Sequence, residues 1–542
     1  MNNSVFKLER PVNEPTREYR PGGDEIRTLL EEVKRQSSIQ VEIPIIIGGK
    51  EIRTGNVADV TMPHDHRHKL GYFHKVGEKE VEMAIEAAME ARKKWSDLSW
   101  DDRVSISLKA ADLISTKRRD LINAATILGQ SKNIWQAEID AACEIADFLR
   151  FNSFNASEIF SVFQPVQSYK TFNRIEFRPL EGFVYAVTPF NFTAIACNLN
   201  MAPAILGNVT VWKPATASVL SSYYLMGIYK EAGLPDGVIN FIPGSGDVIS
   251  RVVLKHKYFS GLHFTGSNET FNSLWRGISE NLPNYRSYPR IVGETGGKDF
   301  IFAHFSADTD ELATAIVLGA FEYQGQKCSA SSRSYIPRSL WPEVKEKILD
   351  RTARIKIGDP ADPQNLMGAV IDEKSFDFIV SYIEEAKKSP DAEIITGGGH
   401  DKSKGYFIEP TVLVCRDPKY PTMEVELFGP VMSIYVYDDD KYEETLKICD
   451  ETSLYGLTGS IFSRDKYAAV LASGILKYAA GNFYINDKTT GAMVGQQPFG
   501  GSRASGTNDK VGSAFNLMRW LNPRAIKDNY QPPVDITFPH MP

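Results

Sequence analysis

The first third of the chain carries apolar residues at the spacing of amphipathic helices. Between Glu78 and Trp95 they recur every three or four positions, which places them on one helical face, at Val81, Ala84, Ile85, Ala88 and Ala91. The same spacing predicts helices over 24–36, 103–115, 121–129 and 136–150. An apolar run within 43–50, followed by two glycines, predicts a strand entering a turn.

From residue 182 onward, short apolar runs alternate with helical segments. Strands are predicted at 182–188, 208–213, 238–242 and 261–266, and the helices between them include 194–206 and 219–233. Unbroken apolar runs are typical of parallel strands that are buried on both faces. Four strand–turn–helix units in a row therefore predict a doubly wound parallel sheet, with ligands at the carboxyl ends of its strands.

The second half of the chain repeats this alternation. Helices are predicted over 308–323, 341–354 and 376–388, and strands around 334–337 and at 431–437, which together indicate a second α/β domain. Between the helix predicted at 136–150 and the strand predicted at 182–188, residues 161–181 are predicted to be extended and to form a hairpin or linker arm. The stretch 491–506 is too rich in glycine for regular structure and predicts a functional loop.

Composition and charge exclude some classes of partner. Of the 542 residues 42% are hydrophobic and the formal net charge is −7, which is ordinary for a globular protein of two or three domains. No cluster of Lys and Arg is interleaved with aromatic residues, so nucleic acid is not expected as a partner. No run of eighteen apolar residues occurs, which argues against a membrane span.

Cysteine usage and the N-terminus bear on the compartment. The five cysteines are scattered without the spacing of metal ligands, as in a reducing compartment. The N-terminus has neither the apolar segment of a secretory signal nor the acid-poor character of a transit peptide, so we expect a cytoplasmic protein, with a processed mitochondrial matrix form as the alternative. His64, His66 and His68 alternate along one segment, which is more typical of a solvated loop or edge than of a metal site. No metal is expected.

Two stretches indicate chemistry. Cys328 stands among small and polar residues after an apolar helical run, whereas structural cysteines are usually packed among aliphatic residues. Upstream, Glu294 lies among glycines that let backbone approach a ligand closely. A lone cysteine is more often an inert core thiol. Together, however, a thiolate and a carboxylate base suffice to take an aldehyde through a thiohemiacetal and to hydrolyse the resulting thioester.

Other local signals are weaker. The cluster Gly244-Ser-Gly246 has Ile249 where a third glycine of a dinucleotide fingerprint would fall, and 293–298 is too short for a phosphate-binding P-loop. Neither cluster alone indicates a cofactor. Acids on the predicted 136–150 helix are usually solvated, although Glu144 or Glu138 is a candidate for a secondary proton-relay group.

Seven motifs occur in order and together resemble the aldehyde dehydrogenase superfamily. They are Pro189-Phe-Asn-Phe192, Trp212-Lys-Pro214, Phe264-Thr-Gly-Ser267, Glu294-Thr-Gly-Gly-Lys298, Gly325-Gln-Lys-Cys328, Glu426-Leu-Phe-Gly-Pro430 and Pro498-Phe-Gly-Gly501. The resemblance covers nearly the whole chain. Within the superfamily, the stretches 321–330, 480–488 and 494–509 resemble the members that oxidise L-glutamate γ-semialdehyde, formed from 1-pyrroline-5-carboxylate, to L-glutamate in proline catabolism.

The resemblance implies an architecture. It is an α/β fold with a Rossmann-type NAD-binding domain over 1–160 and 182–290 and an α/β catalytic domain over 291–497. A β-arm for oligomerisation would be made from 161–181 and 498–542, which includes the C-terminal tail. The implied assembly is a homodimer or a set of dimers, acting on a small aldehyde.

The resemblance also implies residue roles. Cys328 would be the nucleophile and Glu294 the base for thioester hydrolysis, while Asn191 and the Cys328 N–H would stabilise the alkoxide. The implied NAD-binding residues are Thr188, Lys213, Gly266, Ser267, Asn268, Glu269, Thr270, Glu426 and Phe428. Those implied to bind substrate are Phe192, Lys327, Ser329, Gly491, Ala492 and Phe499.

Three positions depart from the family pattern. Thr216 stands where many NAD-preferring relatives carry an acid, so NADP is retained as a weaker alternative to NAD. Phe271 replaces the last glycine of a turn that faces the pyrophosphate, and Ala492 replaces a substrate-anchoring serine. The alternatives are a broad-range aldehyde dehydrogenase, a non-catalytic relative, or an acylating enzyme that passes the thioester to coenzyme A. Such acylating enzymes generally lack the glutamate base, so Glu294 argues against the last of these.

Overall fold

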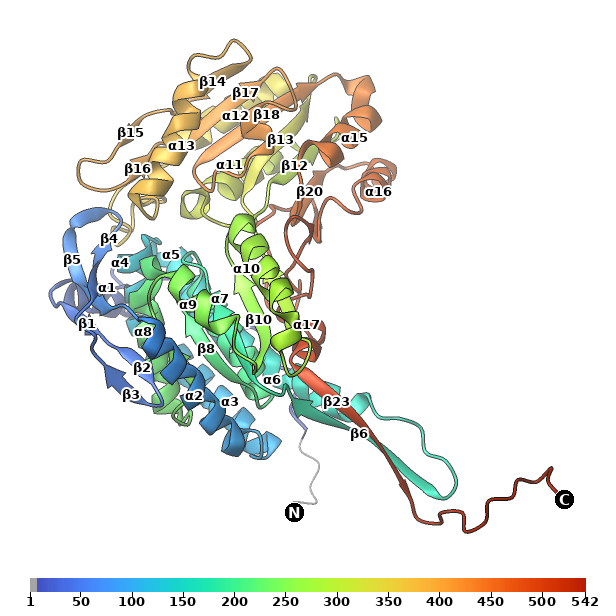
Figure 1. Ribbon diagram of the computed structural model, residues 1–542. Coiled ribbons are helices and arrows are strands. Elements are labelled where there is room, and N and C mark those ends of the chain that lie inside the picture. The colour runs from blue at the N-terminus through green and yellow to red at the C-terminus, as the bar shows by residue number, and fades with distance from the viewer. Residues whose placement is uncertain (1–6) are drawn as a thin grey trace.

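The computed structural model describes residues 7–542 and has two lobes, each built around a seven-stranded sheet (Figure 1). The first sheet has the order β11-β10-β7-β8-β9-β2-β3. Its first five strands are parallel and β2 and β3 form an antiparallel edge, with bounds β7 Phe183–Val187, β8 Val209–Lys213, β9 Ile239–Phe241, β10 Phe259–Thr265, β11 Arg290–Glu294, β2 Ile45–Ile47 and β3 Lys50–Ile52. Every residue of β7 and β10 is buried, as expected for strands covered on both faces. The predicted doubly wound sheet is therefore confirmed.

Helices cover both faces of this sheet. Those that connect its parallel strands are α7 Thr193–Ile205, η2 Thr216–Ser218, α8 Val219–Ala232, α9 Gly246–Val253, α10 Asn268–Glu280 and η3 Leu282–Asn284. The N-terminal helices are α1 Asp24–Ser37, α2 Glu78–Trp95, α3 Trp100–Ser115, α4 Arg119–Gln130, α5 Ile134–Ala137, the π-helix η1 Glu138–Glu144 and α6 Ile145–Val162. The helix predicted at 136–150 is thus interrupted by a wider π-turn and continues to Val162, two residues into the segment predicted to be extended.

A small sheet joins β1 Val41–Ile43, β5 Asp65–His74 and β4 Val57–Met62. It contains the alternating histidines, which do not converge. His66 and His68 each approach a different backbone carbonyl, of Lys402 and Ser37, and no group of three or more potential metal ligands occurs within residues 7–542. The prediction of a solvated segment is wrong for His64, which is buried, and burial lowers the pKa of its ring to about 4.

The second sheet has the order β14-β17-β18-β13-β12-β20-β21. All neighbours are parallel except the edge strand β14, with bounds β12 Asp299–Ala303, β13 Ser331–Pro337, β14 Ala392–Thr396, β17 Thr411–Cys415, β18 Val431–Tyr437, β20 Thr458–Phe462 and β21 Asn482–Ile485. Phe300 and Phe302 join one hydrophobic cluster and Ile301 and Ala303 another, so alternate side chains of β12 build a core on each face.

Shorter elements complete the second lobe. Its helices are α11 Thr309–Phe321, η4 Glu322–Gly325, α12 Trp341–Ala353, α13 Glu373–Ala386, α14 Pro421–Glu424, η5 Asp439–Lys441, α15 Tyr442–Thr452 and α16 Lys466–Ile475. Two short antiparallel sheets pair β15 His400–Asp401 with β16 Phe407–Ile408, and β19 Tyr455–Gly456 with β22 Ser502–Arg503.

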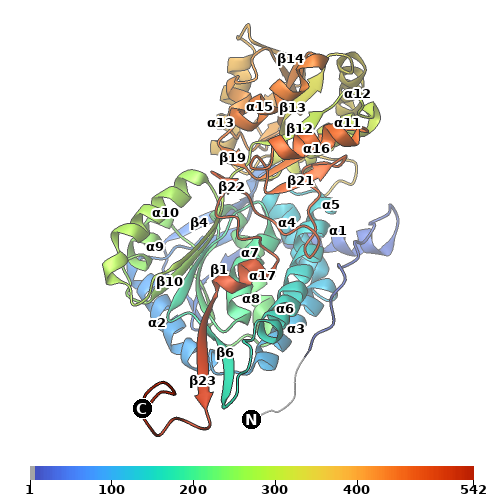
Figure 2. The same cartoon turned by 90° about the vertical axis from the view of Figure 1, so that its right-hand side faces the viewer.

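The chain then returns to the first lobe through α17 Ala514–Arg519 and β23 Leu521–Asn529. Strand β23 pairs antiparallel with β6 Thr171–Pro179 over nine residues, and this two-stranded ribbon projects from the body (Figures 1 and 2). Part of the segment 498–542, which the resemblance places in the arm, lies elsewhere: Phe499 and Val511 exchange two backbone hydrogen bonds beside Glu294.

No helix within residues 7–542 combines the length and apolar character needed to cross a membrane. All five cysteines are free thiols.

Candidate active site

Cys328 and Glu294 line one small cavity of about 90 Å³. The first lobe contributes Gln136, Ile139, Glu144, Phe148, Phe192, Ile195 and Glu294 to its wall. The remaining lining residues come from the cysteine loop and from the C-terminal loops, and are Lys327, Ser329, Thr490, Ala492, Met493, Val494, Gln497, Phe499 and Val511. The cavity is thus bounded by segments that lie more than 300 positions apart in the sequence.

The loop before Cys328 has an unusual backbone. Tyr323 and Gln324 both have positive φ angles, of 50° and 55°, and Gly325 follows with 67°. Such a run is costly for residues with a Cβ atom. Hydrogen bonds fix it in place: Tyr323 Oη donates to the carbonyl of Gln130 at 3.0 Å, and Gln324 Nε2 donates to those of Ser131 and Ala369. The strained turn ends helix α11 and presents Cys328 to the cavity.

The surroundings of Cys328 hold its thiol protonated. Burial raises the pKa of the thiol well above its ordinary value, and the nearby Glu294, Asp299 and Glu426 carboxyl groups raise it further. The side chain is nevertheless only partly buried, because it faces the cavity. Cys328 therefore needs a proton acceptor, or a change of environment on ligand binding, to become a nucleophile.

Glu294 has the properties of a general base. It ends strand β11, is 7% exposed, and its Oε1 atom has no hydrogen-bond partner among the described residues. Burial raises the pKa of this carboxyl to about 8, while Lys510 lowers it and Asp509 raises it. A pKa near the working pH is what proton transfer at neutral pH requires.

Asn191 and Phe192 are positioned by a buried ion pair. The Asp140 carboxylate accepts hydrogen bonds from the N–H groups of Thr193 and Ala194 at 3.0 and 2.9 Å, so it caps helix α7 from the neighbouring π-helix. Lys132 pairs with Asp140 at 2.7 Å and lies 3.9 Å above the ring of Phe192. This arrangement holds the start of α7 against the cavity.

The amide of Asn191 reaches the cysteine loop. Its Nδ2 donates to the carbonyl of Gln326 at 3.1 Å, two residues before Cys328. An amide nitrogen has two N–H groups, so a second donor remains for a ligand oxygen. Asn191 is 3% exposed and does not itself line the cavity wall.

Five of the six expected substrate residues line the cavity, and Gly491 is adjacent to one of them, Ala492. Lys327 is the only cation among the five. Its Nζ lies 3.0 Å from Glu322 Oε2, and the same carboxylate also pairs with Lys488. Two ammonium groups thus share one carboxylate, and of these three side chains only Lys327 lines the cavity.

The two acids considered as proton-relay groups lie in different surroundings. Glu138 does not line the cavity. Its carboxylate is fully buried and bonded by Arg119, Tyr19 and Asn123, and these contacts outweigh the cost of burial and lower its pKa. Glu144 does line the cavity, its Oε2 atom has no partner among the described residues, and burial raises its pKa to about 8. Only Glu144 is available to a ligand.

Several expected cofactor residues lie at or just after the carboxyl ends of strands β7, β8 and β10. Thr188 follows β7 and its hydroxyl accepts from Trp212 Nε1 at 2.9 Å, and Lys213 ends β8. Gly266 donates its N–H to the carbonyl of Glu294 at 3.2 Å, which joins this edge to the candidate base. Ser267 caps helix α10, with its hydroxyl accepting from the N–H of Thr270. Glu269 and Thr270 are exposed on the first turn, and Asn268 donates to the carbonyl of Ala504.

Glu426 and Phe428 approach this edge from the second lobe. Glu426 Oε1 accepts from the N–H of Gly297 at 2.8 Å, and a Cβ atom on Gly296 would lie only 1.9 Å from Glu426 Oε2. Glycine at 296 is thus what allows the carboxylate to lie so close. Phe428 has a φ of 55° and packs edge-on against Phe190 at 5.8 Å.

Phe271 fills space that a neighbouring glycine leaves open. Its ring is 5% exposed and stacks on Phe264 at 5.4 Å, and a Cβ atom on Gly293 would lie 2.2 Å from the Phe271 ring. The departure from the family glycine is therefore matched by Gly293, and the aromatic side chain points into the core.

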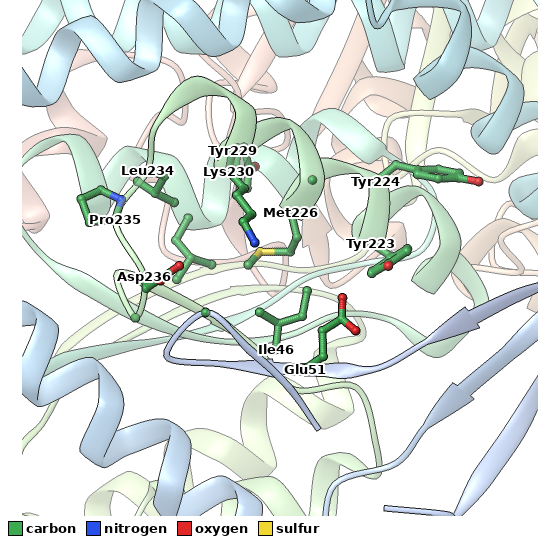
Figure 3. A pocket seen from close by; sticks show the side chains of 14 residues that line it. Ile46, Glu51, Tyr223, Tyr224, Met226, Tyr229, Lys230, Leu234, Pro235 and Asp236 are labelled. Carbon is green, nitrogen blue, oxygen red and sulfur yellow. The ribbon is translucent and has the colours of Figure 1, made fainter. Parts of the chain in front are cut away.

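A second cavity, of about 300 Å³, lies in the first lobe between the β2–β3 hairpin and α8 (Figure 3). Ile239, the first residue of β9, lines it, whereas Lys213 is the last residue of the parallel neighbour β8. The cavity therefore lies at the edge of the sheet opposite to the cofactor candidates. Its wall, made within residues 46–239, contains tyrosines, Glu51, Lys230 and Asp236 but no thiol, so it lacks the group that a thioester intermediate requires.

Sequence reasoning missed several residues of the site. Gln136, Ile139 and Phe148 lie on a predicted helix whose sequence gives no sign of which face is functional, and Val511 belongs to the segment expected to form the arm. The glycine-rich loop is the one signal that points to Thr490, Met493, Val494 and Gln497. The ion pair of Glu322 with Lys488 joins residues 166 positions apart and has no local signature.

A cysteine and a buried glutamate thus line one cavity, beside a doubly wound parallel sheet and a second α/β lobe. A model of the aldehyde dehydrogenase family matches residues 52–526, and the chain belongs to this family. It is an oxidoreductase of this type.

Relatives with a more specific name match over nearly their whole length. The chain is 52% identical over 536 residues to the mitochondrial delta-1-pyrroline-5-carboxylate dehydrogenase of Dictyostelium discoideum, covering 98% of this chain and 96% of that protein. It is 46% identical over 531 residues to the mitochondrial enzyme of the same name from Homo sapiens, with 98% and 94% covered. The delta-pyrroline-5-carboxylate dehydrogenase from Mycobacterium tuberculosis, in a crystal structure bound with NAD, superposes with a TM-score of 0.96 at 45% identity, and both chains are covered to 100%.

Proposed function

We propose that this protein oxidises L-glutamate γ-semialdehyde, the open form of 1-pyrroline-5-carboxylate, to L-glutamate, with NAD as the hydride acceptor. The observation that carries the proposal is the combination in one cavity of Cys328, Glu294 and the unpartnered carboxyl of Glu144. The names of the relatives from Dictyostelium discoideum and Homo sapiens support the same substrate.

The charges around the cavity complement an amino acid. The substrate carries an ammonium and a carboxylate at the end remote from its aldehyde. Glu144 offers an acceptor to the ammonium, and on binding this cation would favour the ionised form of Glu144. The ammonium of Lys327, with the Ser329 hydroxyl and the N–H groups near Ala492, favours the carboxylate. Phe192 and Phe499 would contact the aliphatic middle.

The residues of the chain divide the chemistry in two halves. In the first, the Cys328 thiol gives up its proton to solvent water, the sulfur attacks the aldehyde carbon, and the alkoxide accepts hydrogen bonds from Asn191 Nδ2 and the Cys328 N–H. In the second, Glu294 takes a proton from water and the water oxygen attacks the thioester carbonyl. The carbon–sulfur bond then breaks to release the acid, and Glu294 returns its proton to the sulfur, which restores the thiol. Between the two halves, NAD held by the residues at the sheet edge would supply the acceptor for the hydride that leaves the former aldehyde carbon, which leaves the acyl group on Cys328 as a thioester.

The residues at the sheet edge fit the cofactor. The carboxyl ends of parallel strands and the capped start of helix α10 suit a pyrophosphate. Lys213 and Glu426 would hold the adenosine and nicotinamide riboses: burial lowers the pKa of Lys213, and burial raises that of Glu426 to about 7. We expect NAD to be the preferred cofactor. Because Thr216 brings no negative charge against a 2′-phosphate, NADP should still be used weakly.

A comparison of two aldehydes tests the substrate. We expect kcat/KM for glutamate γ-semialdehyde to exceed that for hexanal by about 10²-fold or more, because the remote charges supply binding energy that hexanal lacks. Ser329→Ala should lower the first value and leave the second nearly unchanged. Equal values for both aldehydes in the wild type would contradict the proposal and identify a broad-range aldehyde dehydrogenase, which the apolar side chains of Ile139, Phe148 and Ile195 also permit.

A non-catalytic relative and an acylating enzyme would each behave differently in the same assay. The non-catalytic relative would form no NADH with either aldehyde. The acylating enzyme would require coenzyme A, whereas the position of Glu294 in the cavity favours water as the acceptor of the acyl group. Assays with and without coenzyme A separate these cases.

We further propose that the ribbon of β6 and β23 serves as an oligomerisation arm and that the protein is a homodimer or an assembly of dimers. The ribbon and its flanking segments expose large apolar side chains, at Val166, Tyr169, Phe172 and Tyr530. Light scattering should give at least twice the mass of 60.5 kDa, and a variant truncated before residue 521 should be monomeric.

The word mitochondrial in the names of the relatives supports the mitochondrial matrix as the location of this protein, over our expectation of the cytoplasm. Cell fractionation would test this location.

A further inference from the structure

An extended N-terminal segment, residues 10–19, crosses the helices that carry one wall of the cavity, and we call it the strap. Its contacts are ionic and specific. Glu14 pairs with Arg119 at 2.7 Å and with Arg150 at 2.6 Å, and Glu138 accepts from the N–H of Arg17 at 2.7 Å and from the Tyr19 hydroxyl at 2.8 Å. The strap is therefore fixed to α4, η1 and α6 over most of its length.

Asn13 connects the strap to the loop 491–497, which lines the cavity. Its Nδ2 donates both to Asp147 Oδ2 at 2.7 Å and to the carbonyl of Val494 at 2.8 Å. Its Oδ1 accepts from Gln496 Nε2 at 2.8 Å. One amide side chain thus joins helix α6 to two residues of the loop 491–497, using donors and an acceptor together.

This loop forms part of the proposed binding site. Ala492, Met493, Val494 and Gln497 line the cavity, and Gly495 has a φ of 81°. A Cβ atom on Gly495 would lie 2.2 Å from the ring of Phe151, so the loop approaches α6 as closely as backbone allows. A glycine-rich loop of this kind has few stiff residues of its own, and its position depends on what holds it.

The other end of the bridge lies one helical turn from the proposed ammonium acceptor. Asp147 follows Glu144 by three residues, at the junction of η1 and α6. Asp147 is 4% exposed, and burial raises the pKa of its carboxyl to about 6, while hydrogen bonds from Asn13 and from the N–H of Glu14 oppose that rise. The strap therefore supplies hydrogen-bond donors that offset part of the cost of burying the Asp147 carboxylate.

We propose that Asn13 is a positioning residue that sets substrate specificity: it fixes the loop 491–497 at the distance from Glu144 that an amino-acid aldehyde requires. The inference rests on the proposed function, because the loop and Glu144 are taken to hold the two charges of the substrate. A substrate without those charges does not depend on that distance.

The test compares two aldehydes in the full-length enzyme. For Asn13→Ala we expect KM for glutamate γ-semialdehyde to rise roughly tenfold, since a displaced anchor loop weakens binding of the remote end. Values of kcat and KM for hexanal should stay within about twofold of the wild type. The matched control is Val12→Ala, which changes the neighbouring strap residue, whose side chain is 82% exposed, and should alter neither substrate.

Gln496→Ala removes one of the two hydrogen bonds between Asn13 and the loop without changing the strap, so it should raise the same KM by a smaller factor and reports on the proposal even if Asn13→Ala folds poorly. The double variant should raise KM for glutamate γ-semialdehyde by much less than the product of the two single effects, because both changes break one connection. An Asn13→Ala enzyme that loses activity equally on both aldehydes, or keeps both, would overturn the inference. If the wild type itself shows no preference for glutamate γ-semialdehyde, the proposed function fails instead.

Discussion

Two carboxyl groups only six residues apart, Glu138 and Glu144, show how differently this protein treats its buried acids. Glu138 is bonded by Arg119, Tyr19, Asn123 and the backbone of Arg17, and its pKa is lowered. Glu144 faces the cavity with an unpartnered oxygen, and its pKa is raised to about 8. The first group holds the strap to the helices. The second keeps its hydrogen-bonding capacity for a ligand, as does Glu294 across the cavity.

The difference follows from the satisfaction of polar groups. A buried carboxylate with several donors is a stable structural element, whereas one without donors is unfavourable until a ligand supplies them. Glu144 and Glu294, which line the cavity, are therefore suited to binding or catalysis, whereas Glu138, which contacts the strap, is suited to stabilising the fold. Substitutions on the two sides should consequently separate activity from stability.

The largest effect is expected at the nucleophile. Cys328→Ala removes the atom that forms the covalent bond, so turnover of any aldehyde should fall by at least about 10⁴-fold. Thermal unfolding should change little, because Cys328 is only partly buried and makes no side-chain hydrogen bond to another of the described residues. Residual steady NADH formation near the wild-type rate would show that another group attacks the aldehyde.

On the strap side the expected loss is in stability. Glu138→Gln leaves Arg119 without its closest buried partner and should lower the free energy of unfolding by about 3 kcal/mol. Turnover of hexanal per folded molecule should be retained. Differential scanning calorimetry beside an active-site titration checks both, and a stable but inactive variant would show that Glu138 takes part in the chemistry after all.

The same acid predicts a pH dependence. The pKa of Glu138 is lower in the folded state than in the unfolded state, so its contribution is present above the unfolded value of about 4.5 and is lost as pH falls through the folded pKa. Melting temperatures measured from pH 7 to pH 3 should therefore fall less steeply in Glu138→Gln than in the wild type. Parallel curves would assign the acid sensitivity to other groups.

A smaller and more specific effect is expected for Glu144→Gln. It should raise KM for glutamate γ-semialdehyde about tenfold and leave hexanal nearly unaffected, because only the first substrate carries an ammonium. Loss of the carboxylate also favours the free amine, which attacks the γ-thioester to form 5-oxoproline and release the Cys328 thiol. Chromatography of the products should show 5-oxoproline beside glutamate. A variant that releases glutamate alone, with unchanged KM, would contradict the role of Glu144.

Residue types along the chain were enough to predict the parallel sheet and to suggest the catalytic pair. The apolar runs of β7 and β10 are continuous, and Cys328 and Glu294 stand among residues that are unusual for a core thiol and a surface acid. The division between Glu138 and Glu144 was not predictable, because a π-helix changes the number of residues per turn and so the face on which each side chain lies. The contact of Asn13 with Val494 joins residues 481 positions apart and depends on the complete fold.

The most direct test of the account is the single turnover of Glu294→Gln with hexanal, whose acyl group cannot cyclise. If Glu294 serves mainly to activate water, this variant should release about one NADH per active site in a rapid burst and then stop, with one acyl group on Cys328 by intact mass. Wild-type turnover should rise with pH through about 8, as the Glu294 carboxyl ionises. Continued turnover by the variant at the wild-type rate, or the absence of both burst and acyl-enzyme, would contradict the assignment of Glu294 as the hydrolytic base.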